Sequence, residues 1–156
     1  GTQWVVVGTG GTILTSPNGI DWTSQDSTTT DQLRGAAWSG SAWIAVGNNG
    51  TILSSSNGTT WSVEATPTPN CLWDVRWNGT QFVAVGDLGT ILTSPTGSVW
   101  TVQTSGTNDL LLGVAWDGTQ WVAVGDAGTI LTSSDGVAWT AATSGINDRL
   151  YGVANH

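Results

Sequence analysis

One stretch of this chain recurs at a fixed interval, and that period constrains the fold more than any other feature. The stretch from Gly118 to Trp139 reads GTQWVAVGDAGTILTSSDGVAW, and edited versions of it begin near residues 1, 40 and 79. A period between about 20 and 50 residues indicates a repeat architecture. Four periods account for all 156 residues of the chain. The repeats align at a spacing of 39 residues, with these aromatic residues in register: Trp4, Trp43, Phe82 and Trp121.

The charge composition excludes one class of function. The chain has no lysine, three arginines and 11 acidic residues, for a formal net charge of −8. A nucleic-acid-binding protein needs clustered cations to displace the counterions of the phosphates, and this chain has too few of them. Its apolar runs, such as residues 121–125, are much shorter than the roughly 18 residues that indicate a membrane-spanning helix. We therefore expect neither nucleic-acid binding nor a membrane span.

A single cysteine, Cys71, and a single histidine, His156, can form neither an internal disulfide nor a metal site of their own. We therefore expect no cofactor. The low charge and the many Thr, Ser, Gly and Trp residues favour an extracellular or cell-envelope location. The lack of methionine and the start within a repeat favour a mature, excised or engineered piece.

Each period reads as four short strands separated by turn signals. The first strand is 113–116, with counterparts at 35–38, 74–77 and 152–155. Two-residue turns such as Asn78-Gly79 and Asp117-Gly118 follow it, and these pairs favour the positive φ angles of a type I′ hairpin. The second strand is 120–124, the third is 129–133, and the fourth begins at Trp139. No segment has a helical apolar period longer than one turn, so we predict an all-β fold.

Four-stranded antiparallel units of about 40 residues in tandem are typical of a β-propeller. The alternative, a β-solenoid, would need shorter coils and parallel strands, and would not need a tight hairpin in each repeat. We predict one propeller domain over 1–156. Its blades are expected at 1–28 plus 150–156, 33–66, 72–105 and 111–144.

The first blade lacks an innermost strand unless the C-terminus supplies one. Because an open strand edge is generally avoided, we expect residues 150–155 to pair beside residues 3–8. Pairing within one chain gives a closed ring of four blades, and pairing between two chains gives a homodimeric ring of eight. Deletion of 150–156 is expected to cause aggregation or oligomerisation.

The turn before the fourth strand carries a family resemblance. The string from Ser133 through Asp135 and Gly136 to Trp139 resembles the Asp-box (BNR) repeat of sialidase-like propellers, with one residue fewer before the glycine. The longer string from Gly125 to Gly136 is similar to repeats of photosystem II stability/assembly-factor-like propellers. The resemblance implies a structural turn, in which the carboxylate accepts backbone N–H groups and the tryptophan packs on the sheet. It does not extend to sialidase activity. The chain has three arginines, one tyrosine (Tyr151) and one glutamate (Glu64), but the repeat places Glu64 in a fourth strand, away from the ring centre.

The repeated tryptophans indicate the core, and one position that varies among the repeats indicates a candidate site. Ten of the 11 tryptophans fall in repeated positions, which indicates a packing role; Trp73 is the exception. Large, chemically different side chains at the start of each first strand are what a ligand site would use, while plugging of the central channel is the structural alternative. The candidate ligand-binding positions are Arg34, Trp73, Leu112 and Tyr151, together with the acidic residues Asp31, Asp109 and Asp148.

These acids allow two further interpretations. A ring of oxygen ligands can hold Ca²⁺, and a pair of carboxylates can catalyse glycoside hydrolysis. More often such side chains accept local backbone hydrogen bonds, and we assign neither a metal site nor a catalytic residue. The expected function is a non-enzymatic binding module for a glycan or a protein. A structural or assembly scaffold, or an engineered or excised repeat array, is the alternative, and a glycoside hydrolase is the weakest. Substitution Trp73→Ala is expected to abolish ligand binding with little change in melting temperature.

Overall fold

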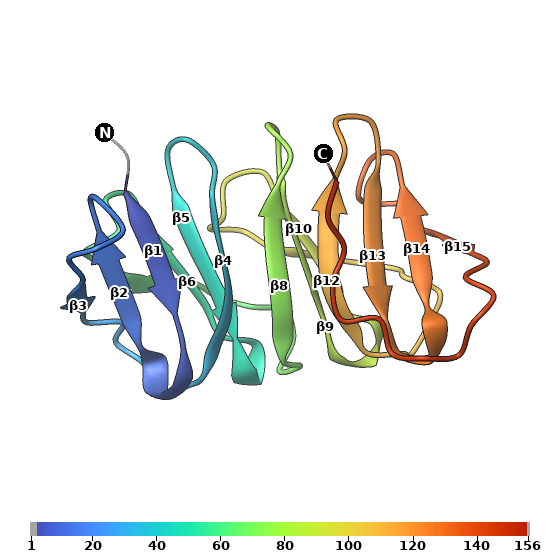
Figure 1. The fold of residues 1–156 in the computed structure, drawn as a ribbon, viewed down its shortest axis with the longest axis horizontal. Helices are drawn as coiled ribbons and strands as arrows, with labels where there is room; N and C mark the ends of the chain where they lie inside the picture. The colour runs from blue at the N-terminus through green and yellow to red at the C-terminus, as the bar shows by residue number, and fades with distance from the viewer. Residues whose placement is uncertain (1–2, 156) are drawn as a thin grey trace.

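The chain folds into four antiparallel sheets that stand side by side in an arc (Figure 1). The computed structural model describes residues 3–155. Consecutive strands pair within each sheet, so we call the sheets blades 1 to 4 in chain order. The predicted all-β class is confirmed. The longest helical segment in residues 3–155 is a single 3-10 turn, so no helix there could span a membrane.

The strand bounds are as follows. Blade 1 contains β1 (Trp4–Val7), β2 (Ile13–Ser16) and β3 (Thr23–Gln25). Blade 2 contains β4 (Leu33–Trp38), β5 (Trp43–Gly47), β6 (Ile52–Ser55) and β7 (Ser62–Val63). Blade 3 contains β8 (Leu72–Trp77), β9 (Phe82–Gly86), β10 (Ile91–Ser94) and β11 (Thr101–Gln103). Blade 4 contains β12 (Leu111–Trp116), β13 (Trp121–Gly125), β14 (Ile130–Ser133) and β15 (Thr140–Ala142).

A 3-10 turn links the second and third strands of the complete blades and the first two strands of blade 1. These turns are η1 (Thr9–Gly11), η2 (Asn48–Gly50), η3 (Asp87–Gly89) and η4 (Asp126–Gly128). The central residue of each turn has a positive φ angle, including the non-glycine residue Leu88 at 54°. The final glycine of each turn is buried against the loop that leads into the next inner strand.

The hairpin turns differ from the prediction. A type I′ turn needs two residues with positive φ, but in the β8–β9 turn only Gly79 (φ 102°) has one, and Asn78 does not. Instead, the Asn78 side-chain oxygen accepts the N–H groups of Thr80 and Gln81 at 2.9 and 2.8 Å. These side-chain hydrogen bonds stabilise the turn without a positive φ angle at Asn78. Residues 78–81 therefore form a four-residue connection between the paired residues Trp77 and Phe82.

The innermost strands β4, β8 and β12 lie beside one another, and their backbones approach closely (Figure 1). A Cβ atom added to Gly35 would lie 3.1 Å from the Cα atom of Asp74 in the next inner strand. Glycine at this position therefore permits the close spacing of neighbouring blades.

The hydrophobic core lies between the blades, where two different faces of neighbouring sheets pack together. We call the two sides of a blade its aromatic face and its aliphatic face. In blade 3 the aromatic face carries Phe82, Ala84, Leu92 and Trp100, and the aliphatic face carries Val83, Val85 and Ile91. The aromatic faces of blades 2, 3 and 4 each pack on the aliphatic face of the blade before them. This head-to-tail packing buries apolar area at three junctions.

The predicted packing role of the repeated tryptophans holds for several of them, but not for Trp38, which is 40% exposed although blade 1 precedes its blade. Trp61, Trp100 and Trp121 are buried. Trp4 and Trp22 occupy equivalent positions in blade 1 and are exposed, because no blade among the described residues covers the aromatic face of blade 1.

The predicted ring closure does not hold in this structure. Residues 150–155, expected beside residues 3–8, lie next to β12 at the opposite end of the arc (Figure 1). Among the described residues, β1 pairs only with β2. The four sheets follow one another in an arc that stays open between blade 4 and blade 1 (Figure 1). Blade 1 is therefore three-stranded here, without the predicted contribution of 150–156; residues 1–2 and 156 lie outside the described residues.

Candidate ligand-binding site

A β-bulge at the start of each inner strand creates a row of equivalent positions. Strand pairing shifts by one residue just after Leu33, and the same shift occurs in β8 and β12. A bulge redirects a side chain and is frequent next to functional sites. The strands β8 and β12 begin at the lower edge of the arc in Figure 1. The extra residues, together with the equivalent position of the C-terminal segment, form what we call the bulge row: Arg34, Trp73, Leu112 and Tyr151.

Arg34 and Trp73 are in contact across the junction of blades 2 and 3. The Arg34 Cζ atom lies 3.7 Å from the centroid of the Trp73 ring, which is within the range of a cation–π interaction. Arg34 Nε donates to Asn48 Oδ1 at 2.7 Å, and Trp73 Nε1 donates to Asp87 Oδ1 at 2.7 Å. Each side chain is thus held by the 3-10 turn of its own blade, and both are half-buried.

The other half of the row is more open. Leu112 has no polar group to donate, and Asp126, at the position equivalent to Asp87, instead forms an ion pair with Arg149. Arg149 Nη2 donates to Asp126 Oδ2 at 3.0 Å, and this hydrogen bond and the carboxylate charge raise the pKa of Arg149. Tyr151 is 74% exposed, with its ring centroid 6.0 Å from Arg149 Cζ.

Two of the candidate acids bind threonines of the fold. Asp31 Oδ2 accepts the hydroxyl of Thr51 at 2.7 Å. Asp109 Oδ2 accepts the hydroxyls of Thr129 at 2.6 Å and Thr107 at 2.9 Å. These hydrogen bonds stabilise the carboxylate and lower the pKa of Asp109. Both side chains therefore link the loop before an inner strand to the turn that follows the second strand.

Asp148 contributes to the fold through its backbone. Its carbonyl oxygen accepts the N–H of Gly128 at 2.8 Å, while its side chain is exposed. Within residues 3–155, no three His, Cys, Asp or Glu side chains come together as metal ligands. The acids thus stand apart from one another, each with its own local contacts.

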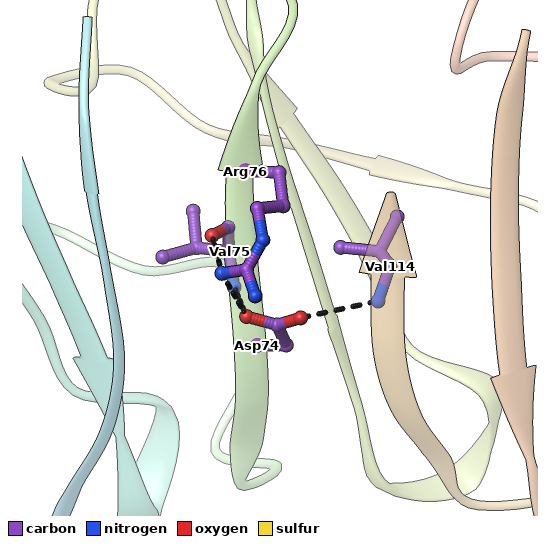
Figure 2. A network of polar contacts seen from close by, with 4 residues as sticks. All are labelled: Asp74, Val75, Arg76 and Val114. Atoms are coloured by element: carbon purple, nitrogen blue, oxygen red, sulfur yellow. Dashed lines mark hydrogen bonds and ion pairs between the residues drawn. The ribbon is translucent and has the colours of Figure 1, made fainter. Parts of the chain in front are cut away.

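Asp74 forms a network that the candidate residues did not include (Figure 2). Its Oδ1 atom accepts from Arg76 Nη1 at 2.6 Å and from the N–H of Val75 at 2.9 Å. Its Oδ2 atom accepts the N–H of Val114 at 3.2 Å, so the side chain links β8 to β12. Burial raises the pKa of Asp74, although the Arg76 charge and the two backbone N–H groups act in the opposite direction.

The turn before the fourth strand has the structural role that was expected. Asp135 Oδ1 accepts the N–H groups of the two residues after Gly136 at 2.8 and 2.9 Å, which lowers the pKa of Asp135. Trp139 Nε1 donates to the Gly136 carbonyl at 2.9 Å. Asn18 and Asn57 accept the corresponding pair of backbone bonds in blades 1 and 2.

The bulge row is an open surface. One hollow of about 500 Å³ is lined by parts of 106–109, 127–131 and 141–147, so it shares only Asp109 with the candidate residues. A ligand of the row would therefore lie across it rather than within an enclosed pocket.

The sequence places Asn48, Asp87 and Asp126 in the glycine-rich turns on the same loop face, but their hydrogen bonds and ion pair with the row and its neighbour Arg149 were not predicted. Asn48, Asp87 and Asp126 each follow a bulge residue by 14 positions, and that constant offset between a variable residue and an Asn or Asp is a signal in the sequence. The signal for Asp74 is an acid at a position where the other three repeats have glycine: Gly35, Gly113 and Gly152.

No protein-family model matches this chain, and no curated protein sequence matches it. Solved structures do match. A structure described as YCF48 bound to a D1 peptide has a TM-score of 0.74 at 16% identity, over 95% of this chain and 52% of that one. YCF48 from Cyanidioschyzon merolae has a TM-score of 0.68 at 22% identity, over 90% of this chain and 53% of that one. The β-propeller domain of Cps50 (Swd1) from Myceliophteria thermophila has a TM-score of 0.62 at 14% identity, over 91% and 53%.

These matches define the class of the fold as a β-propeller, as the repeat predicted. The antiparallel sheets are not those of the alternative β-solenoid. The chain spans about half the length of these propeller chains. The likeness to photosystem II assembly-factor-like propellers holds at the level of the fold.

Proposed function

We propose that this chain is a non-enzymatic protein-binding module that holds an extended peptide segment of a partner across the bulge row. The contact between Arg34 and Trp73 is the observation on which this proposal depends. Tryptophan and arginine are enriched among residues that dominate binding energy at protein interfaces. Because Asn48 and Asp87 already fix these two side chains, little side-chain entropy is lost on binding.

The charge and the structural relatives support a peptide ligand. The net charge of −8 favours a segment with basic residues, since complementary charge speeds association and disfavours wrong partners. One structural relative is YCF48 bound to a D1 peptide, so a fold of this kind can bind a peptide. An assembly role would use the same surface to hold a partner protein in place.

The carboxylates beside the row support a role without catalysis. A glycoside hydrolase needs a carboxyl group whose pKa is raised, so that it can act as the acid. The threonine hydrogen bonds of Asp109 lower its pKa instead. Burial does raise the pKa of Asp74, but this carboxylate already accepts hydrogen bonds from Arg76 and from the N–H groups of Val75 and Val114. Binding of a glycan is favoured by one feature, the exposed ring of Tyr151, on which a sugar could stack.

Selection from a phage library of random 12-residue peptides, followed by calorimetry with the enriched peptides, tests the proposal. Trp73→Ala is expected to weaken binding by about 30-fold or more, because a central aromatic anchor is worth about 2 kcal/mol or more. Trp73→Phe keeps an aromatic surface under Arg34 and is expected to retain most of the affinity.

Trp38→Ala is the matched control, because Trp38 lies at the other end of an inner strand and is also partly exposed. Its affinity for the enriched peptides is expected to equal that of the unmodified chain. If Trp73→Ala and Trp38→Ala weaken binding equally, or if the library yields no binder while a glycan array does, the proposed peptide site is wrong.

A further inference from the structure

The two ends of the arc expose opposite halves of the same blade-to-blade interface. At the blade 1 end, Trp4 is 59% exposed, whereas its counterparts Phe82 and Trp121 are fully buried. Likewise, Trp22 is 40% exposed and its counterpart Trp61 only 4%. Blade 1 thus presents an aromatic face with no blade against it in residues 3–155.

The blade 4 end presents the complementary aliphatic face. Val122 and Ile130 are partly exposed, whereas their counterparts in blades 2 and 3 are fully buried under the next blade. Inside the chain, an aliphatic face of this kind always receives the aromatic face of the following blade. The surface at one end of the arc is therefore shaped to receive the surface at the other end.

Residues 150–155 occupy the place of an inner strand that belongs to a following blade. A Cβ atom added to Gly113 would lie 3.1 Å from the Cα of Gly152, the same separation as between Gly35 and Asp74 at the junction of blades 2 and 3. The N–H of Leu150 donates to the Gly125 carbonyl at 2.9 Å, as the N–H of Leu33 donates to the Gly8 carbonyl at 2.9 Å. The segment is placed like β4 and β8, yet no second strand within residues 3–155 pairs with it.

We propose that blade 1 of a second copy of this chain docks on blade 4, with its β1 paired antiparallel to residues 150–155. The exchange is mutual, so two copies form a closed ring of eight blades about a twofold axis. The pairing of β4 with β5 gives the register, because Ala36 pairs with Ala45. By the same offset, Val153 of one copy pairs with Val6 of the other.

Three observations favour a second copy as the occupant. It carries both the exposed aromatic face and the unpaired strand β1. It can therefore cover the aliphatic face of blade 4 and pair with residues 150–155 at the same time. Each docked tryptophan can bury about 150–250 Å². Each copy also offers the aliphatic face of blade 4 and the segment 150–155 to these two features of the other copy, so the contact is mutual.

The pairing also extends the bulge row. Tyr151 would lie beside Arg34 of the partner subunit, as Trp73 lies beside Arg34 within one copy. In this respect the inference builds on the proposed function, although the assembly itself can be measured without any peptide. If the ring forms and no peptide binds, only the proposed function fails.

Molar mass in solution is the first test. Light scattering after size exclusion at micromolar concentration is expected to give twice the 16.1 kDa of the chain. A single-copy mass over the whole concentration range would overturn the proposal.

Substitution Val6→Arg is the second test. The Val6 side chain is 45% exposed in a single copy, so a single copy tolerates the arginine, but in the ring the charge would be buried without a partner. We expect the dissociation constant of the dimer to rise by about 100-fold or more, while the circular dichroism spectrum stays unchanged. Val102→Arg changes a similarly exposed valine on β11, away from both end faces, and is expected to remain dimeric. A dimer equally stable in both variants would show that the copies associate through another surface.

Disulfide trapping tests the register even where Val6→Arg fails to fold. Cys71 is first replaced by serine, and a chain with Val6→Cys is then mixed with a chain with Val153→Cys. Directly paired residues lie within the Cα separation that a disulfide spans, so oxidation is expected to give a covalent dimer on a non-reducing gel. Val7→Cys places the thiol on the other face of β1 and is expected to give none. Equal cross-linking of the Val6 and Val7 variants, or no cross-linking of either, would rule out this pairing.

Discussion

At the scale of single residues, one carboxylate joins two blades. Asp74 stands where blades 2 and 4 have glycine, and its Oδ2 atom reaches the N–H of Val114 in the neighbouring inner strand (Figure 2). Its side chain is only 14% exposed. The pKa of Asp74 is raised because the cost of burying the charge exceeds the stabilisation by Arg76 and the backbone N–H groups.

This raised pKa predicts how Asp74→Asn changes the pH dependence of stability. A group whose pKa is higher in the folded state gives its full stabilisation below its unfolded pKa and loses it as the pH rises through the folded pKa. Asparagine does not titrate. The free energy of unfolding of Asp74→Asn, relative to the unmodified chain, is therefore expected to rise between about pH 3 and about pH 7 in urea titrations.

Asp135→Asn is the matched control for Asp74→Asn, and it should show the opposite trend. Backbone N–H groups lower the pKa of Asp135 in the folded chain, so this carboxylate stabilises the fold above its unfolded pKa and the effect is lost as the pH falls. Asn57 already occupies the equivalent position in blade 2. A relative stability that changed with pH in the same direction for both variants would contradict the assignment for Asp74.

At the scale of the elements, the 3-10 turns hold side chains in an unfavourable backbone conformation. Leu88 in η3 has φ 54° and Ala127 in η4 has φ 52°, whereas η1 has Gly10 at φ 63°. A left-handed conformation costs a non-glycine residue about 1–2 kcal/mol. The turns keep it because the following glycine must pack against the loop before the next inner strand.

Leu88→Gly is therefore expected to stabilise the chain. Relief of the backbone strain exceeds the extra entropy that glycine gives the unfolded chain, for a net gain of roughly 0.5–1 kcal/mol. The Leu88 side chain is mostly exposed, so little buried area is lost. The free energy of unfolding from denaturant titration measures the change. Val102→Gly, at an exposed strand position with negative φ, should instead lose stability, and a loss of stability in Leu88→Gly would show that the turn is not strained.

At the scale of the whole molecule, each blade packs only on its neighbours. The cores at the three junctions do not merge into a single cluster. Stability in such arrays is approximately a sum of unit and nearest-neighbour terms. Blades 2 and 3 have two packed faces, whereas blades 1 and 4 have one each within a single copy.

Hydrogen exchange should report this arrangement. In the monomeric Val6→Arg variant, amides of β2 and β14 are expected to exchange faster than those of β6 and β10, because end blades open more easily than central ones. In the unmodified chain at dimer concentration the proposed ring covers both ends, and the difference is expected to shrink. Mass spectrometry of peptic fragments measures both states. If end and central blades differed in exchange rate by the same amount in the monomeric variant and in the unmodified chain, closure by a second copy would be contradicted.

The sequence by itself determined the strands and the faces of the sheets. Alternation along a segment such as Phe82–Gly86 fixes which side chains share a face, because successive residues of a strand point in opposite directions. The repeat of this pattern predicted four sheets, and the variable positions identified the residues of the bulge row, although not the bulges themselves. The resemblance to Asp-box repeats implied the backbone hydrogen bonds that Asp135 accepts in its turn.

The tertiary structure alone decided how the sheets are arranged. The angle between blades depends on how an aromatic face packs on an aliphatic face, and the sequence period carries no information about that angle. For this reason the same four repeats that predicted a closed ring form an open arc, with residues 150–155 beside β12. Contacts between blades, such as Arg34 on Trp73 and Asp74 with Val114, likewise exist only because packing brings residues about 40 positions apart into contact.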